Sequence, residues 1–274
     1  MSATENGGSL LSRAFSASEA VYDLAPKLLV LSLPFIIWEV TARSGLVGAE
    51  VLPPLGPTLG KIGELIALGD IPARAGETLG GWAISLAIAT VVAIPFGVLV
   101  GSSDFAYRST RLIVDALRSV PPLGLIPLAL LLFGARRYTE LMVTVPTMLW
   151  PIMLQVAYGI RDIDPMTLET SRSMRLSRRV LYTQVIFPAI LPYLMTGLRL
   201  ASIMGLLLCI GVEVLTLVPG VGSAIAIAQS VGAVLDVYAY TLVAIGLGVA
   251  MTALAYAVER AVVPWKASSR RASR

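Results

Sequence analysis

The apolar runs of this chain constrain its fold more than any other feature. An α-helix needs about 20 mainly apolar residues to cross the hydrocarbon core of a bilayer. Six stretches of the sequence fit that requirement, at residues 26–42, 78–101, 112–133, 141–160, 185–208 and 238–258. Only 14% of the residues are charged, whereas an average soluble domain has about 25%. We therefore expect an all-α membrane protein with six transmembrane helices.

The composition excludes several classes of function. Histidine is absent and Cys209 is the only cysteine, which argues against a disulfide framework, a metal centre and a histidine-activated nucleophile. Residues 56–62 resemble a phosphate-binding loop but lack the Ser or Thr that follows its lysine. We expect no catalytic, metal or cofactor site in this chain. Its basic residues lie beside the spans, which is not a nucleic-acid pattern.

The basic residues also predict an orientation. Of the 21 Lys and Arg residues, fourteen lie near span ends on the side of the two termini and five on the other side. The remaining two, Arg118 and Arg199, lie within spans. By the positive-inside rule both termini are cytoplasmic, in agreement with an even number of spans. No signal peptide is expected, because the first apolar run is too long and lacks a small-residue cleavage site.

A dense cluster of charges separates the fourth and fifth predicted spans, within residues 161–184. Asp164 before Pro165 predicts a capped helix start, and the helix is expected to end near Met174. Ser177 then predicts a second cap, which gives a helix, a tight turn and a second helix. One interpretation is an ordinary positive-inside loop. The other is a docking surface for a soluble partner, which the length favours because a simple connection needs only a few residues.

The segment 211–237 is too apolar for an outer loop and is broken by Pro219 and the glycines beside it. We expect it to be partly re-entrant, since irregular backbone at membrane depth needs protein or a water-filled cavity around it. A seventh span is the alternative.

Charged residues inside spans are candidates for function. Arg118, Arg199 and Glu213, together with the helix-breaking Pro121 and Pro122, are the candidate transport-pathway residues. For Arg118 the alternative is a pair with Asp115, and for Arg199 a structural bond to a neighbouring helix. The prolines either line a cavity or only set the curvature of the bundle.

Several motifs resemble those of one family. Glu169-Thr170-Ser171, followed by Phe187–Pro192 and Thr196–Arg199, resembles the EAA loop of binding-protein-dependent ABC importer permeases. Most of the chain resembles the nitrate, sulfonate, taurine and thiamine-precursor branch, through 37–39, 52–53, 77–79, 118–129, 133–134 and 211–215. Two features depart from the family pattern. Thr170 and Ser171 replace two alanines, and Arg175 replaces a glycine that makes a tight turn. Because positive φ is costly for arginine, we expect either a turn shifted by one residue or a helical Arg175.

The resemblance implies a type I importer permease with a cytoplasmic coupling helix. The ATPase-coupling residues would be Glu169, Thr170, Ser171, Arg172, Ser173, Met174, Arg175 and Leu176. It also implies two ATPase subunits that bind ATP and Mg, a second copy of this permease and an extracytoplasmic solute-binding protein. The domains expected are a cytoplasmic tail (1–25), a permease domain (26–263, coupling loop 161–184) and a basic cytoplasmic tail (264–274), in the inner membrane of a bacterium.

The substrate class expected from the branch is a small polar, anionic nutrient, such as nitrate, a sulfonate, taurine or a small organic acid. A vitamin precursor is the alternative within the class. An ion-coupled secondary transporter is the rival from another class. It predicts buried acidic pairs or inverted repeats with broken helices, and neither is evident in the sequence.

Overall fold

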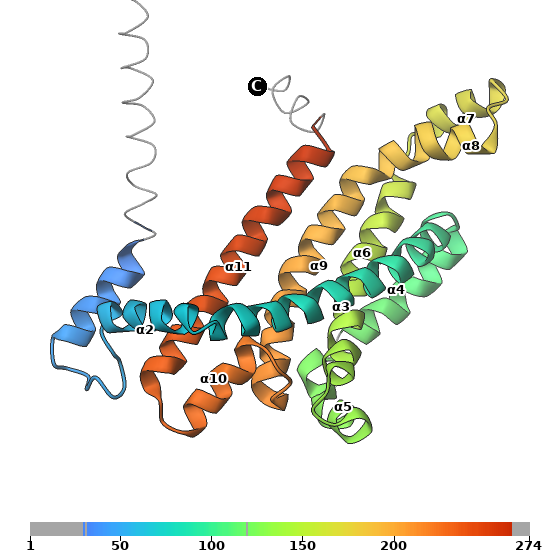
Figure 1. Cartoon of the computed structure of the whole chain (residues 1–274). Helices are drawn as coiled ribbons and strands as arrows, with labels where there is room; N and C mark the ends of the chain where they lie inside the picture. Colours follow the sequence, from blue (N-terminus) through green and yellow to red (C-terminus); the bar gives the residue numbers. More distant parts are fainter. Residues whose placement is uncertain (1–29, 31, 119, 265–274) are drawn as a thin grey trace, which may run out of the picture. The chain divides into compact units, whose positions relative to one another are not determined.

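A computed structural model of the chain describes residues 30, 32–118 and 120–264. The regular elements among these residues are all helical (Figure 1). After a helix at residues 32–43 they are α2 (Leu55–Ala67), α3 (Asp70–Gly101), α4 (Asp104–Arg118), the 3-10 helix η1 (Pro122–Leu125), α5 (Ile126–Phe133), α6 (Arg137–Arg161), α7 (Pro165–Ser173), α8 (Arg178–Val180), the π-helix η2 (Leu181–Ile186), α9 (Phe187–Thr216), α10 (Val221–Ser230) and α11 (Val234–Val262).

The chain divides into two compact units, Met1–Lys61 and Ile62–Arg274. In the first unit, the loop after the helix at 32–43 returns onto that helix. The Trp38 indole N–H donates to the Pro53 carbonyl at 2.9 Å, and the Leu55 backbone N–H donates to the Glu39 carboxylate at 2.7 Å. Glu39 thereby satisfies one of the backbone donors left free at the start of a helix.

Four helices among the described residues are long and apolar enough to cross a membrane. They are Asp70–Gly101, Arg137–Arg161, the stretch Arg178–Ser230, which includes α8, η2, α9 and α10, and Val234–Val262. They correspond to the second, fourth, fifth and sixth predicted spans, and each is longer than predicted. The first predicted span, 26–42, lies partly outside the described residues.

The third predicted span, 112–133, is not one helix. α4 ends at Arg118, η1 begins at Pro122, and α5 begins at Ile126 with Pro127 in its first turn. The prolines explain the division, because each lacks a backbone donor and disfavours helical geometry in the residue before it. The helix-breaking role expected for Pro121 and Pro122 is therefore confirmed, and this stretch is divided into three separate helices.

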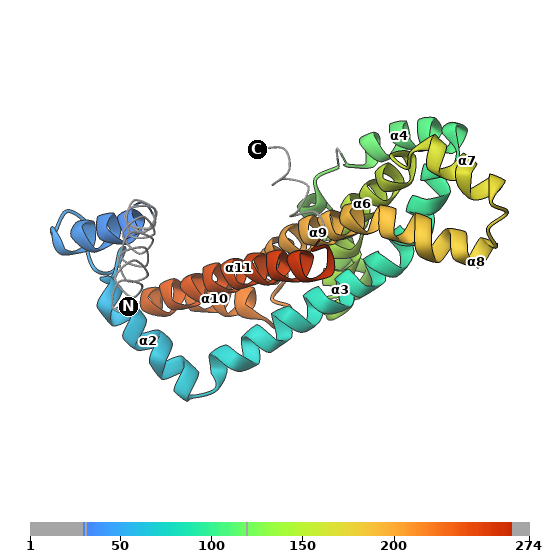
Figure 2. The same ribbon diagram turned by 90° about the horizontal axis from the view of Figure 1, so that it is seen from above.

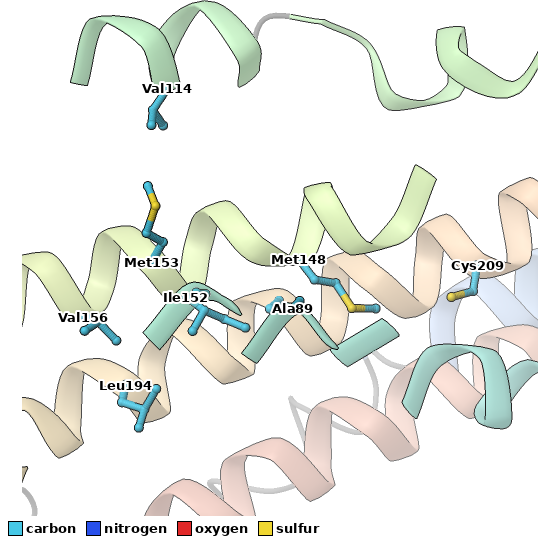
Figure 3. Close-up of a cluster of buried hydrophobic side chains, with 10 residues drawn as sticks. Ala89, Val114, Met148, Ile152, Met153, Val156, Leu194 and Cys209 are labelled. Atoms are coloured by element: carbon cyan, nitrogen blue, oxygen red, sulfur yellow. The ribbon is translucent and has the colours of Figure 1, made fainter. Parts of the chain in front are cut away.

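The core of the second unit forms where α3, α6 and α9 pack together. Ala89 of α3, Met148 and Ile152 of α6, and Cys209 of α9 are fully buried in one cluster (Figure 3). Glycines allow the helices to approach closely. A Cβ on Gly97 would lie 2.7 Å from the Met153 carbonyl oxygen, and one on Gly101 would lie 2.9 Å from that of Ala157. These two glycines, four residues apart on one face of α3, thus form a close contact with α6.

The segment 211–237 contains a short helix rather than a seventh span. Its first residues complete α9, and α10 has only ten residues, about 15 Å of helix. α10 packs against α9, α11 and α3. Its backbone is therefore surrounded by protein, which a re-entrant segment would require; the re-entrant position itself stays a prediction.

The α3–α6 contact can be tested with matched glycine substitutions. Gly97→Ala forces a methyl group against the α6 backbone, and overpacking of this kind costs about 1–3 kcal/mol. Gly80→Ala, on the same helix, meets nothing within 4 Å and should be neutral or stabilising. Thermal unfolding in detergent, followed by size-exclusion chromatography, should show a lower Tm for Gly97→Ala alone. Equal Tm values for the two variants would contradict the close contact.

Candidate functional site

The charged stretch after α6 forms a helix, a turn and a second helix, as the sequence predicts. The Met166 backbone N–H donates to the Asp164 carboxylate at 2.9 Å, which caps α7 with Pro165 in its first turn. The Val180 N–H donates to the Ser177 hydroxyl at 3.4 Å and caps α8. We call residues 164–180 the α7–α8 segment. It extends beyond the ends of α6 and α9 in both views (Figures 1 and 2).

The turn in this segment differs from the expectation for Arg175. Its φ is 50°, so Arg175 has left-handed backbone geometry. The turn is therefore not shifted to a neighbouring residue, and Arg175 is not helical. The Leu176 N–H donates to the Ser171 carbonyl at 3.2 Å, and the Arg175 N–H to that of Arg172 at 2.9 Å. These two bonds form a Schellman motif and satisfy carbonyls at the end of α7. They offset the cost of left-handed backbone in a non-glycine residue, about 1–2 kcal/mol.

The candidate coupling residues are mostly exposed. Ser171 alone is buried, with its hydroxyl donating to the Thr167 carbonyl at 2.7 Å, and Leu176 is half-buried. Glu169 is exposed, and exposed methionines flank it at Met166 (66%) and Met174 (68%). Methionine adapts its shape to different surfaces. The segment therefore presents a carboxylate between adaptable apolar side chains to whatever lies beyond the permease.

The left-handed turn can be tested at Arg175. Arg175→Gly should keep the turn and raise stability by up to about 1 kcal/mol, because glycine adopts this geometry without strain. Arg175→Val should destabilise the turn, because a β-branched residue is strongly disfavoured there. Limited proteolysis of the segment measures both effects. Faster cleavage of Arg175→Gly than of Arg175→Val would show that the turn does not need positive φ.

Glu213, a candidate pathway residue, is fully buried and holds the start of α10. Its carboxylate accepts hydrogen bonds from the Thr78 hydroxyl and the Gly222 backbone N–H, both at 2.9 Å. The Val221 N–H in turn donates to the Thr78 hydroxyl at 2.9 Å. A Cβ on Gly220 would overlap the Glu213 carboxylate. A buried charge requires such bonds, so this arrangement joins α9, α3 and α10.

A second buried carboxylate, at Glu140, was not among the residues singled out from the sequence. The Arg137 guanidinium donates to Glu140 at 2.6 Å and to Glu77 of α3 at 2.5 Å. The Cys209 thiol lies beside the Glu140 carboxyl. Gly81 leaves the space for this group, since a Cβ there would overlap both Glu140 and Arg137. The sequence signal for this site is an acidic residue directly before the fourth predicted span.

Substitution of Thr78 tests the buried polar layer, by which we mean Thr78, Glu213 and the first backbone N–H groups of α10. Thr78→Val deletes one hydroxyl and leaves both the Glu213 carboxylate and the Val221 N–H short of a partner. A buried group left unsatisfied costs about 1–3 kcal/mol, so the Tm should fall by several degrees. Thr78→Ser keeps the hydroxyl and should stay near the parent. An equally large fall in Tm for Thr78→Ser would show that the site depends on the shape of the side chain rather than on its hydroxyl.

Arg199 is paired rather than free. Its guanidinium lies 2.9 Å from the Glu259 carboxylate of α11 and 4.6 Å from the centre of the Tyr256 ring. Both charged side chains are largely buried, at 20% and 13% exposed. This geometry favours the structural alternative for Arg199, a link between α9 and α11.

Pro122 lines a groove of about 590 Å³, formed by η1, α6 and α9. One face of α6 supplies Thr147, Trp150, Gln155 and Tyr158. Pro121 lies between two residues of this wall, Val120 and Pro122. Arg118 ends α4 three residues before Pro121, and its side chain lies outside the described part of the structure. The groove thus brings Pro122 together with polar side chains that sequence reasoning did not single out, and leaves Arg199 and Glu213 outside its lining.

The chain belongs to the family of binding-protein-dependent transport system inner membrane components, which matches residues 93–267, more than half of the chain. Its relatives in this family are permease subunits of ABC importers, in which the ATPase is a separate subunit.

Three known proteins show the similarity. The nitrate import permease protein NrtB of Synechocystis is 33% identical over 140 residues, which cover 51% of this chain and 50% of that protein. SsuC of Bacillus subtilis, named as an aliphatic sulfonates transport permease protein, is 26% identical over 251 residues, 90% of each chain. A chain of the inward-facing MetNI methionine ABC transporter matches with a TM-score of 0.60 and 19% identity, over 70% of this chain and 96% of that one. The last match shows the fold.

Proposed function

We propose that this chain forms the membrane pore of an ATP-driven importer for a small polar anion. In this proposal two copies of the permease (residues 26–263) work with two ATPase subunits and an extracytoplasmic binding protein. The copies would expose the substrate alternately to the two sides of the membrane. Family membership supports the importer class, and the relatives named for nitrate and aliphatic sulfonates support an anion.

The observation that carries the proposal is the exposed, doubly capped α7–α8 segment. A loop that only connected α6 to α9 would not need two caps and a Schellman turn around Arg175. Its local bonds hold α7 in one shape, which reduces the entropy lost when a partner binds. We assign the ATPase contact to this segment, with Glu169 at its centre.

The groove beside Pro122 is the proposed path of the substrate. None of the described residues that line it is charged, whereas Thr147 and Gln155 are polar and Trp150 and Tyr158 are aromatic with polar tips. A passage must bind its substrate strongly enough to admit it and weakly enough to release it. Neutral donors meet that requirement for an anion better than a fixed cation would. Selection among anions would then lie with the binding protein.

The proposed orientation places both termini and the α7–α8 segment in the cytoplasm. The segment carries Arg172, Arg175, Arg178 and Arg179, and such an excess of arginine is typical of cytoplasmic loops. The same orientation puts the segment on the side where ATP is available.

Native mass spectrometry of the tagged chain, gently solubilised from its own host membrane, tests this function. We expect two copies of the chain with two copies of an ATPase. Glu169→Arg should reduce the ATPase-bearing fraction, because a reversed charge at an interface costs several kcal/mol. Glu169→Gln, which keeps the shape of the side chain, should give an ATPase-bearing fraction between those of the parent and Glu169→Arg. A stable species of this chain alone, before any detergent exchange, would favour the ion-coupled rival instead.

A further inference from the structure

We propose that Arg161 is a positioning residue, which transmits displacement of the α7–α8 segment to the wall of the groove through α4. The inference rests on the proposed function and assigns a route within it. Arg161 is the last residue of α6 and lies three residues before Asp164, the cap of α7. Any displacement of the α7–α8 segment reaches this position first on the α6 side.

Arg161 contacts α4 in two ways. Its guanidinium donates to the Asp104 carboxylate at 2.6 Å, and its central carbon lies 4.3 Å from the centre of the Tyr107 ring. A planar guanidinium can make an ion pair and stack on a ring at the same time, which a lysine ammonium does less well. Asp104 and Tyr107 both belong to the first turn of α4. Arg161 therefore fixes the start of that helix to the end of α6.

The ion pair is present at neutral pH. The hydrogen bond from Arg161 holds the pKa of the Asp104 carboxyl below its ordinary value. The contribution of this pair is therefore complete above the ordinary value and is lost only as the pH falls through the lowered one.

α4 extends from its contact with Arg161 towards the groove. It has 15 residues and so spans about 22 Å as a continuous helix. Val114, near its middle, is buried in the core cluster. Just beyond its end, Val120, Pro122 and Leu125 form one wall of the groove. A helix held at its start and in the middle transfers displacement at one end to the other.

A shorter connection runs beside it. The rings of Tyr107 and Tyr158 meet edge to face with centres 6.4 Å apart, and Tyr158 lines the groove. Asp162 accepts a hydrogen bond from the Tyr193 hydroxyl of α9, and Tyr193 packs on Gly159. The end of α6 is thus held to α9 as well as to α4.

The experiment measures whether nucleotide reaches the groove. Cys209 is the only natural cysteine and is buried, so Gln155→Cys gives a single reactive thiol in the groove. The complex with its ATPase is treated with a small methanethiosulfonate reagent, both without nucleotide and after trapping with ATP and vanadate. The ratio of the two labelling rates reports the nucleotide-dependent change at the groove wall.

In the Gln155→Cys background we expect that ratio to depart clearly from one. Arg161→Gln and Asp104→Asn should return it close to one, while basal ATPase activity and Tm stay unchanged. Arg161→Lys, which keeps the charge, should restore part of the change. Tyr107→Phe should keep it and Tyr107→Leu should reduce it, because only the former retains the ring. Arg74→Gln, the same change in a half-buried ion pair within α3, is the matched control.

The outcomes separate the two proposals. If Gln155→Cys shows a nucleotide-dependent ratio that Arg161→Gln and Asp104→Asn leave intact, the role of Arg161 is overturned and the importer function stands. If Gln155→Cys shows no nucleotide dependence at all, the groove is not the moving path, and the inference falls together with that part of the proposed function. An equal loss in Arg74→Gln would also overturn the inference, since the effect would then not depend on the α4 contact.

Discussion

Close backbone contact among α3, α6 and α9 is the constraint on which the rest of the structure depends. Inside a bilayer there is little hydrophobic gain from bringing two helices together, so association relies on tight packing and on hydrogen bonds. Gly97 and Gly101 bring α3 against α6, and a Cβ on Gly197 of α9 would lie 3.0 Å from Ile152 of α6. These contacts fix the frame from which α10, the groove and the α7–α8 segment are positioned.

The packing of α3, α6 and α9 also determines where charged side chains can be buried. Glu213 and Glu140 are both fully buried, and each is supported from α3, by Thr78 in one case and through Arg137 and Glu77 in the other. Gly81 and Gly220 leave room for the two carboxylates. Charges at such positions are costly without partners. The polar layer therefore ties α10 to the bundle and depends on the helices being close enough to share it.

The two proposed functional regions lie at different places on this bundle. At one end the α7–α8 segment leaves the bundle, held in shape by its own caps and turn rather than by the core. Alongside α6, the broken helix at Pro121 and Pro122 leaves a groove with neutral polar side chains. Arg161 lies between the two and contacts α4. The proline break, which prevents α4 and α5 from forming one crossing, is also what gives the groove its wall.

The sequence by itself determined the features that depend on near neighbours along the chain. Apolar runs predicted the four long helices, Asp164 and Ser177 predicted both caps, and the motif order indicated the permease family. Only the tertiary structure decided which charges meet. Thr78 and Glu213 are 135 positions apart, and Asp104 and Arg161 are 57 apart, so no local pattern encodes these pairs. The left-handed Arg175 also escaped prediction, because two backbone hydrogen bonds within the turn outweigh the residue's own preference.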